Sequence, residues 1–182
     1  MFWHSPVAGA PTESFEAKLA SFHDSLNACK PDGFVEALSF RVAGLPWGHG
    51  QDLVYEDWYV VEDFAALGTL NDAAVSGPTR GPHDAVAKDF MEGSGGVFKL
   101  ISGSLDLHQA RFAAWIGKKI GPSYDSYYED VSHVVGESNT DLWRRQMVLG
   151  PSPQFCVHSV NPVSFPEEFR PLTVRLELLA PK

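Results

Sequence analysis

Two histidines are the candidates for proton transfer in this sequence, His83 and His158. His83 follows Pro82 at the expected start of a helix, and His158 lies in an expected strand. An imidazole with a reference pKa of about 6.5 suits general-base chemistry near neutral pH. The alternatives are a capping or solvent-exposed role for His83 and a structural hydrogen bond for His158. Catalysis by these two residues is therefore a hypothesis.

Arginine and tryptophan side chains recur on the expected strands and suggest a binding site for a small anionic or aromatic molecule, because guanidinium groups pair with carboxylates. The alternative is that each arginine pairs across strands with a neighbouring carboxylate such as Glu56 or Glu177. The residues expected to bind substrate are Arg41, Trp58, Trp115, Arg144 and Arg175.

The two cysteines, Cys29 and Cys156, form no CxxC motif, and the histidines show no metal-ligand spacing. A structural zinc site needs about four close ligands, so we expect no metal and no cofactor. A haem held by one of the scattered histidines is kept as an alternative. The cysteine content favours a reducing compartment.

The chain of 182 residues carries 23 acidic and 14 basic residues, with a net charge of −9. Nucleic-acid binding draws on clustered Lys and Arg, so we expect no nucleic-acid partner. No apolar run approaches the roughly 20 residues that span a bilayer, and the N-terminus lacks the pattern of a secretory signal. These features predict a cytoplasmic protein without a membrane partner.

Hydrophobic periodicity predicts the order β-α-β-β-α-β in the first half of the chain. Thr12 is the expected N-cap of the first helix. The predicted strands cover residues 2–7, 34–42, 53–61 and 97–102, and the predicted helices cover residues 12–29 and 62–75, followed by a short helix over 82–91.

The second half repeats this order more loosely, at an offset near 110 that places Phe2 on Phe112 and His23 on His133. We predict two modules, residues 1–105 and 106–182, with the second helix of the second module degenerate. The predicted elements are strands over 112–117, 142–149, 155–160 and 172–179, a helix over 121–135, and a Pro-interrupted link over 161–170.

Helices should cover one face of each sheet and need apolar partners, so the polar face of each strand is the expected lining of a cavity. On residues 34–42 that face carries Ser39 and Arg41, and on the last strand it carries Arg175. On the second hairpin it carries Arg144 and Gln146, with Cys156 and His158 opposite.

This α+β order of two tandem ferredoxin-like modules resembles the dimeric α+β barrel superfamily. Residues 55–88 (YEDWYVVEDFAALGTLNDAAVSGPTRGPHDAVAK) are similar to the antibiotic-biosynthesis-monooxygenase-like and NIPSNAP-like members. The resemblance implies antiparallel sheets packed as a barrel around a cavity, within one chain or in a homodimer.

Known activities of the superfamily include cofactor-independent oxygenation, isomerisation and haem chemistry, so the fold by itself fixes no reaction. We expect a small-molecule-binding protein, with a cofactor-independent monooxygenase or isomerase as its enzymatic form. In that form His83 or His158 would abstract a proton and an arginine would steady the developing anion. The alternatives are a non-catalytic binding or oligomerisation module and a haem protein of the chlorite dismutase-like branch.

Overall fold

The computed structural model describes every residue except 49, 52, 105, 147–149 and 180–182. The described chain divides into two compact units. Unit 1 comprises residues 1–41, 48–94 and 178–179, and unit 2 comprises residues 42–47 and 95–177, each without the residues excepted above.

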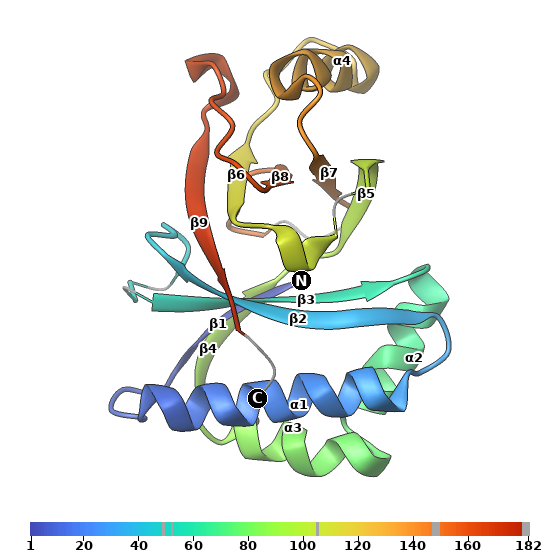
Figure 1. Ribbon diagram of the computed structural model, residues 1–182, viewed down its shortest axis with the longest axis vertical. Helices are drawn as coiled ribbons and strands as arrows, with labels where there is room; N and C mark the ends of the chain where they lie inside the picture. The colour runs from blue at the N-terminus through green and yellow to red at the C-terminus, as the bar shows by residue number, and fades with distance from the viewer. Residues whose placement is uncertain (49, 52, 105, 147–149, 180–182) are drawn as a thin grey trace. The chain divides into compact units, whose positions relative to one another are not determined.

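Unit 1 is built on four antiparallel strands in the order β4-β1-β3-β2. All three of its helices lie on one face of these strands (Figure 1). That face holds a core that contains Phe15, Leu19 and Leu26 of α1 and Tyr55 of β3. Its elements are β1 (Phe2–Pro6), α1 (Thr12–Cys29), β2 (Phe34–Ala43), β3 (Leu53–Val61), α2 (Phe64–Ala74), a 3₁₀ turn (Gly77–Thr79), α3 (Arg80–Ala87) and β4 (Phe90–Gly95).

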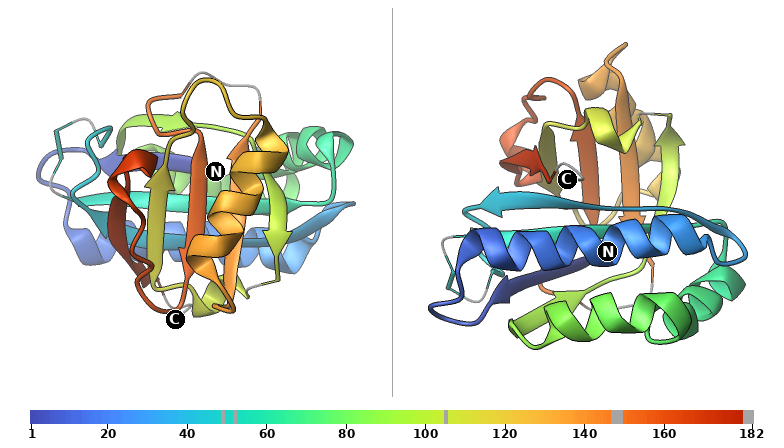
Figure 2. Two further views of the ribbon diagram at one scale, coloured as in Figure 1. Left: turned by 90° about the horizontal axis from the view of Figure 1, so that it is seen from above. Right: turned by 60° about the horizontal axis from the view of Figure 1, so that its bottom comes forward.

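Unit 2 has five antiparallel strands in the order β9-β6-β8-β7-β5. One helix, α4, lies across one face of this sheet (Figure 2). Tyr127 and Val131 of α4 are buried there against Phe155 and Val157 of β8. Its elements are β5 (Phe98–Gly103), a 3₁₀ turn (Leu107–Gln109), β6 (Phe112–Ile116), α4 (Tyr124–Val135), β7 (Thr140–Arg145), β8 (Phe155–Ser159), a 3₁₀ turn (Glu167–Phe169) and β9 (Leu172–Leu178).

The predicted mixture of helices and antiparallel strands is confirmed, and the 161–170 link carries the 3₁₀ turn Glu167–Phe169. The main error concerns residues 82–96. The short helix begins at Arg80 and ends at Ala87, and a strand that the sequence analysis missed, β4, follows it. Gly93 lies inside this strand and does not end a helix. A Cβ at Gly93 would lie 2.6 Å from the Phe2 ring, so the missing side chain lets β4 approach β1.

Smaller differences concern helix and strand ends. The N-cap of α1 is Pro11 and not Thr12, and no side chain caps it. The strand predicted over 142–149 is β7, which ends at Arg145, and residues 147–149 lie outside the described residues. Asp63 caps α2 by accepting a hydrogen bond from the Ala66 amide at 2.8 Å, as expected for an acid at a helix start.

Gly103 at the end of β5 has a φ of +111°, and a Cβ there would lie 2.2 Å from the backbone oxygen of Thr140. We expect Gly103→Ala to lower the free energy of unfolding by about 2 kcal/mol or more, because a left-handed conformation and a backbone clash add together. Gly68 in α2 has open space around it and no positive φ. Gly68→Ala should instead raise stability by about 0.5–1 kcal/mol. Urea denaturation of both variants measures this contrast, and equal effects would contradict it.

Candidate functional site

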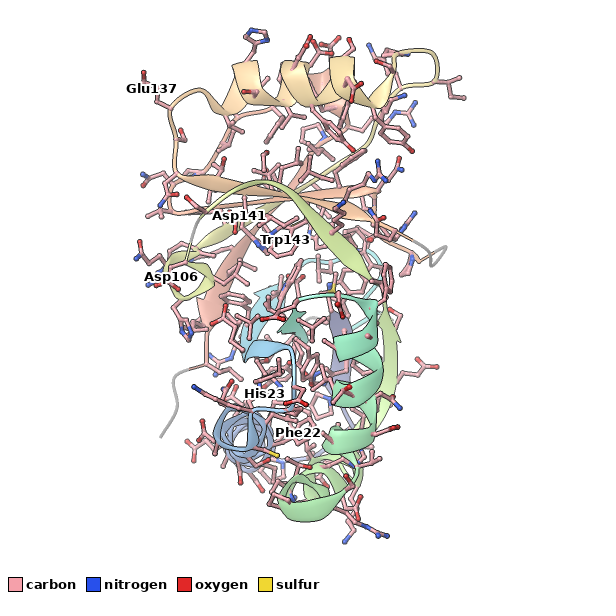
Figure 3. The ribbon with its side chains drawn as sticks, turned by 90° about the vertical axis from the view of Figure 1, so that its right-hand side faces the viewer. Phe22, His23, Asp106, Glu137, Asp141 and Trp143 are labelled. Atoms are coloured by element: carbon pink, nitrogen blue, oxygen red, sulfur yellow. The ribbon has the colours of Figure 1, made fainter. Side chains whose placement is uncertain are left out.

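Four polar side chains form a buried cluster in unit 1, which we call the Asp57 cluster: His4 of β1, His23 of α1, and Asp57 and Tyr59 of β3. Strand pairing aligns Phe2 with Asp57 and His4 with Tyr55. His4 and Asp57 are therefore diagonal neighbours on one face of the sheet, within reach of each other. That face is the one covered by the helices, and Figure 3 shows His23 between α1 and the α2–α3 side of unit 1.

One carboxylate oxygen, Oδ2 of Asp57, is the centre of this cluster. It lies 2.8 Å from Nε2 of His4 and 3.5 Å from Nε2 of His23. The Tyr59 hydroxyl donates to the same oxygen at 3.2 Å and lies 3.2 Å from Nε2 of His23. Asp57, His4 and His23 are each no more than 5% exposed. The cluster thus joins two strands and a helix through a single buried acceptor.

The surroundings of Asp57 shift two pKa values in opposite directions. Burial alone would raise the pKa of Asp57, but the nearby His4 and His23 hold it well below its ordinary value. Burial, reinforced by the Asp57 charge, raises the pKa of Tyr59 well above its ordinary value. At neutral pH Asp57 is therefore a carboxylate and Tyr59 a neutral hydroxyl donor.

Glu56 lies on the opposite face of β3 and is fully buried. Its Oε2 accepts a hydrogen bond from the indole nitrogen of Trp3, and its Oε1 accepts one from the indole nitrogen of Trp58, both at 2.8 Å. Both oxygens thus have donors that are themselves buried. This arrangement gives Trp58, which the sequence analysis placed in a binding site, a structural contact with a carboxylate.

The two histidines chosen as catalytic candidates lie in different units. His83 is on α3 of unit 1, where its Nδ1 lies 3.1 Å from Oδ1 of Asp84 and its ring meets Phe22 edge-on at 5.5 Å. His158 is on β8 of unit 2, fully buried, with its ring 6.5 Å from that of Trp143. Only His83 is partly open to solvent.

Two of the three arginines that were predicted to bind substrate face helices. The guanidinium of Arg41 binds Glu16 of α1, with Nε 3.0 Å from Oε1, and Arg144 donates to the Tyr128 hydroxyl of α4 at 2.8 Å. The prediction that these polar strand faces turn away from the helices is therefore wrong. The physical reason is that the helices themselves supply polar partners, a carboxylate in α1 and tyrosines in α4.

The remaining predicted binding residues of unit 2 are Arg175 and Trp115, which lie on two different strands of its sheet. Arg175 is exposed on β9, paired in register with Phe112. Trp115 is fully buried on β6, where its ring lies 5.4 Å from Trp47 and 5.8 Å from Phe98. Within unit 2, two strands separate β9 from β7, which carries Arg144.

A pocket of about 210 Å³ opens on unit 2 between the end of β6, α4 and the 3₁₀ turn at Glu167–Phe169. The Tyr127 side chain is buried in its wall, and the Tyr127 hydroxyl has no hydrogen-bond partner among the described residues. We call this the Tyr127 pocket. Its lining residues are Gly117, Lys119, Pro122, Tyr127, Asp130, Glu168 and Phe169.

Neither Asp57 nor the residues of the Tyr127 pocket are among the site residues predicted from the sequence. A signal for Asp57 was present, because an acid in the middle of the apolar run 53–61 must find partners once buried. The pocket had no such signal, because its walls come from three segments whose proximity only the folded chain creates.

The described residues also bear on metal binding, membrane crossing and the state of the two cysteines. No group of three or more His, Cys, Asp or Glu side chains in this part of the chain could hold a metal ion, and none of its helices has the length and apolarity needed to cross a bilayer. Cys29 is exposed at the end of α1, whereas Cys156 is buried in β8.

Comparisons with known proteins found no matching family model, no matching curated protein and no matching solved structure.

Proposed function

We propose that this chain is a small-molecule-binding α+β protein whose ligand site is the Tyr127 pocket. One observation carries the proposal: Tyr127 lines this pocket, and its buried hydroxyl has no partner among the described residues. A buried polar group without a partner costs about 1–3 kcal/mol, and a ligand that pairs with it would remove that cost. The aromatic rings of Tyr127 and Phe169, 5.6 Å apart, supply apolar surface for the same ligand.

We further propose that both units follow the ferredoxin-like plan. In unit 1 the sheet order is β4-β1-β3-β2, so the fourth strand lies beside the first, the first beside the third, and the third beside the second. In unit 2 the order β9-β6-β8-β7 is the same when β6 is counted as the first strand, and β5 is added at the β7 edge. This repeated order supports a duplicated β-α-β-β-α-β unit. The packing of two sheets as a barrel stays a prediction. An experimental structure with a different strand order in either unit would refute the duplication.

Proton-transfer catalysis is the second candidate function, and the surroundings of His83 favour it. Phe22, which contacts His83, also lies 5.9 Å from the His23 ring of the Asp57 cluster. A substrate beside His83 would therefore lie near a buried carboxylate–imidazole network. If replacing His83 and His158 together left turnover of a discovered substrate intact, this assignment would fail. The homodimer, the haem alternative and the cytoplasmic location stay predictions.

Filling the pocket tests the binding proposal. Gly117 lines it, has no positive φ, and a Cβ there would meet only the Phe169 carbonyl oxygen at 3.9 Å. We therefore expect Gly117→Val to fold normally and to weaken fragment binding at least tenfold. The measurement is a fragment screen by ligand-observed NMR, with amide shifts mapping the hits. Gly81→Val on α3, also in open space, is the control. Hits that bind both variants equally, or no hits at all, would refute the site.

A further inference from the structure

The charged side chains that line the Tyr127 pocket are two carboxylates and one ammonium group, so the lining has a net negative charge. Lys119 and Glu168 pair with each other, with Nζ 3.1 Å from Oε2. Asp130, the third charged residue of the lining, has no hydrogen bond or ion pair with any described residue. An unpaired carboxylate at the wall of a pocket favours a cation inside it.

The aromatic part of the wall favours the same kind of ligand. The ring faces of Tyr127 and Phe169 carry the negative side of their quadrupoles, which attracts an ammonium group. Burial, together with the nearby Asp130 charge, raises the pKa of Tyr127, so its hydroxyl stays neutral. A neutral hydroxyl can accept a hydrogen bond from an ammonium N–H and donate its own hydrogen to a second group.

The size of the pocket limits the ligand. A volume of 210 Å³ corresponds to that of about seven liquid waters at roughly 30 Å³ each. It falls below the range of about 300–1,000 Å³ that drug-sized ligands occupy. One six-membered ring with a short side arm suits this space.

We propose that the Tyr127 pocket binds a small primary amine carried on a single aromatic ring, with the ammonium beside Asp130 and the ring against Tyr127 and Phe169. This inference rests on the proposed function, because it names the ligand class of the same pocket. It keeps the aromatic part of the ligand predicted from the sequence but not the anionic part, which rested on Arg41, Arg144 and Arg175; none of these arginines lines the pocket.

Three probes of nearly equal shape test the inference: phenethylamine, 2-phenylethanol and phenylacetate. Binding to the full chain is measured by NMR titration in low salt, where an exposed carboxylate such as Asp130 is least screened. We expect phenethylamine to bind at least about fivefold more tightly than the alcohol, and phenylacetate to bind most weakly. Asp130→Asn should remove the preference for the amine over the alcohol. Glu129→Gln, on the same helix but outside the lining, should keep it.

The outcomes separate the two proposals. If the alcohol or the acid binds as well as the amine and shifts the pocket amides, the amine assignment is wrong while the pocket remains a binding site. If phenethylamine binds but Asp130→Asn keeps its preference, the role of Asp130 is refuted. If none of the probes binds and the fragment screen finds other pocket ligands, the ligand class is refuted. If nothing binds there in either experiment, both proposals fail.

Discussion

Replacing Asp57 with asparagine is expected to lower the free energy of unfolding by about 3 kcal/mol at pH 7, because removing one partner of a buried ionic group leaves the others uncompensated. His4, His23 and Tyr59 all converge on the Oδ2 atom that would lose its charge. For a chain of this length the loss corresponds to a fall in melting temperature of roughly 6–12 °C.

Calorimetry or urea denaturation measures this loss. Asp24→Asn is the matched control, because Asp24 is exposed on α1 directly after His23. A surface change of that kind should stay within about 0.5 kcal/mol. If Asp57→Asn were as stable as the control, the Asp57 cluster would be energetically unimportant.

The stabilisation by Asp57 should also depend on pH in a defined direction. Its pKa in the folded protein lies below the value of about 3.9 expected in the unfolded chain. The contribution is therefore present above about pH 4 and is lost as the pH falls toward the folded pKa. The stability curves of the native protein and Asp57→Asn should therefore converge as the pH falls below about 4. A gap that widened below pH 4 would contradict this sign.

Glu56→Gln is expected to cost about 2–3 kcal/mol, although glutamine has nearly the same shape. The two Glu56 oxygens each accept an indole N–H at 2.8 Å. In glutamine one of these oxygens becomes an NH₂ group, so a donor faces a donor and one buried indole N–H loses its acceptor. The substitution therefore tests whether both hydrogen bonds need a carboxylate.

The measurement is chemical denaturation followed by far-UV circular dichroism, with tryptophan fluorescence as a second probe. Glu62→Gln is the control, because Glu62 is exposed just after β3. A loss below 1 kcal/mol for Glu56→Gln would show that the indoles tolerate an amide equally well.

Much of the local structure follows from the sequence alone. The period of Phe15, Leu19, Phe22 and Leu26 predicts α1, which begins at Thr12 and ends at Cys29 as expected. The density of Tyr, Trp and Val predicts β3 over Leu53–Val61. The helical period works because one face of α1 is buried in the core, whereas the middle of β3 is buried on both faces and so favours large apolar side chains. β4 was not predicted because its two glycines, Gly93 and Gly95, are typical of a loop. Only the close approach to Phe2 explains why Gly93 suits a strand.

The candidate sites followed less well from the sequence. Glu56 and Asp57 are adjacent in the strand sequence, yet one accepts from two indoles and the other from histidines and a tyrosine, because strand neighbours point to opposite faces. Arg41 was assigned to a cavity because it is polar, but α1 supplies Glu16 to its side of the strand. Sequence patterns indicate which residues share a face, whereas the partner on the next element depends on tertiary packing.

The two cysteines differ in solvent exposure, so a thiol reagent should modify them at different rates. Cys29 is open to solvent in unit 1 and Cys156 is fully buried in unit 2. A thiol reagent will therefore label Cys29 at once and reach Cys156 only when β8 opens. The first thiol carries a spectroscopic dye without mutagenesis, and the modification rate of the second reports how often unit 2 opens under native conditions.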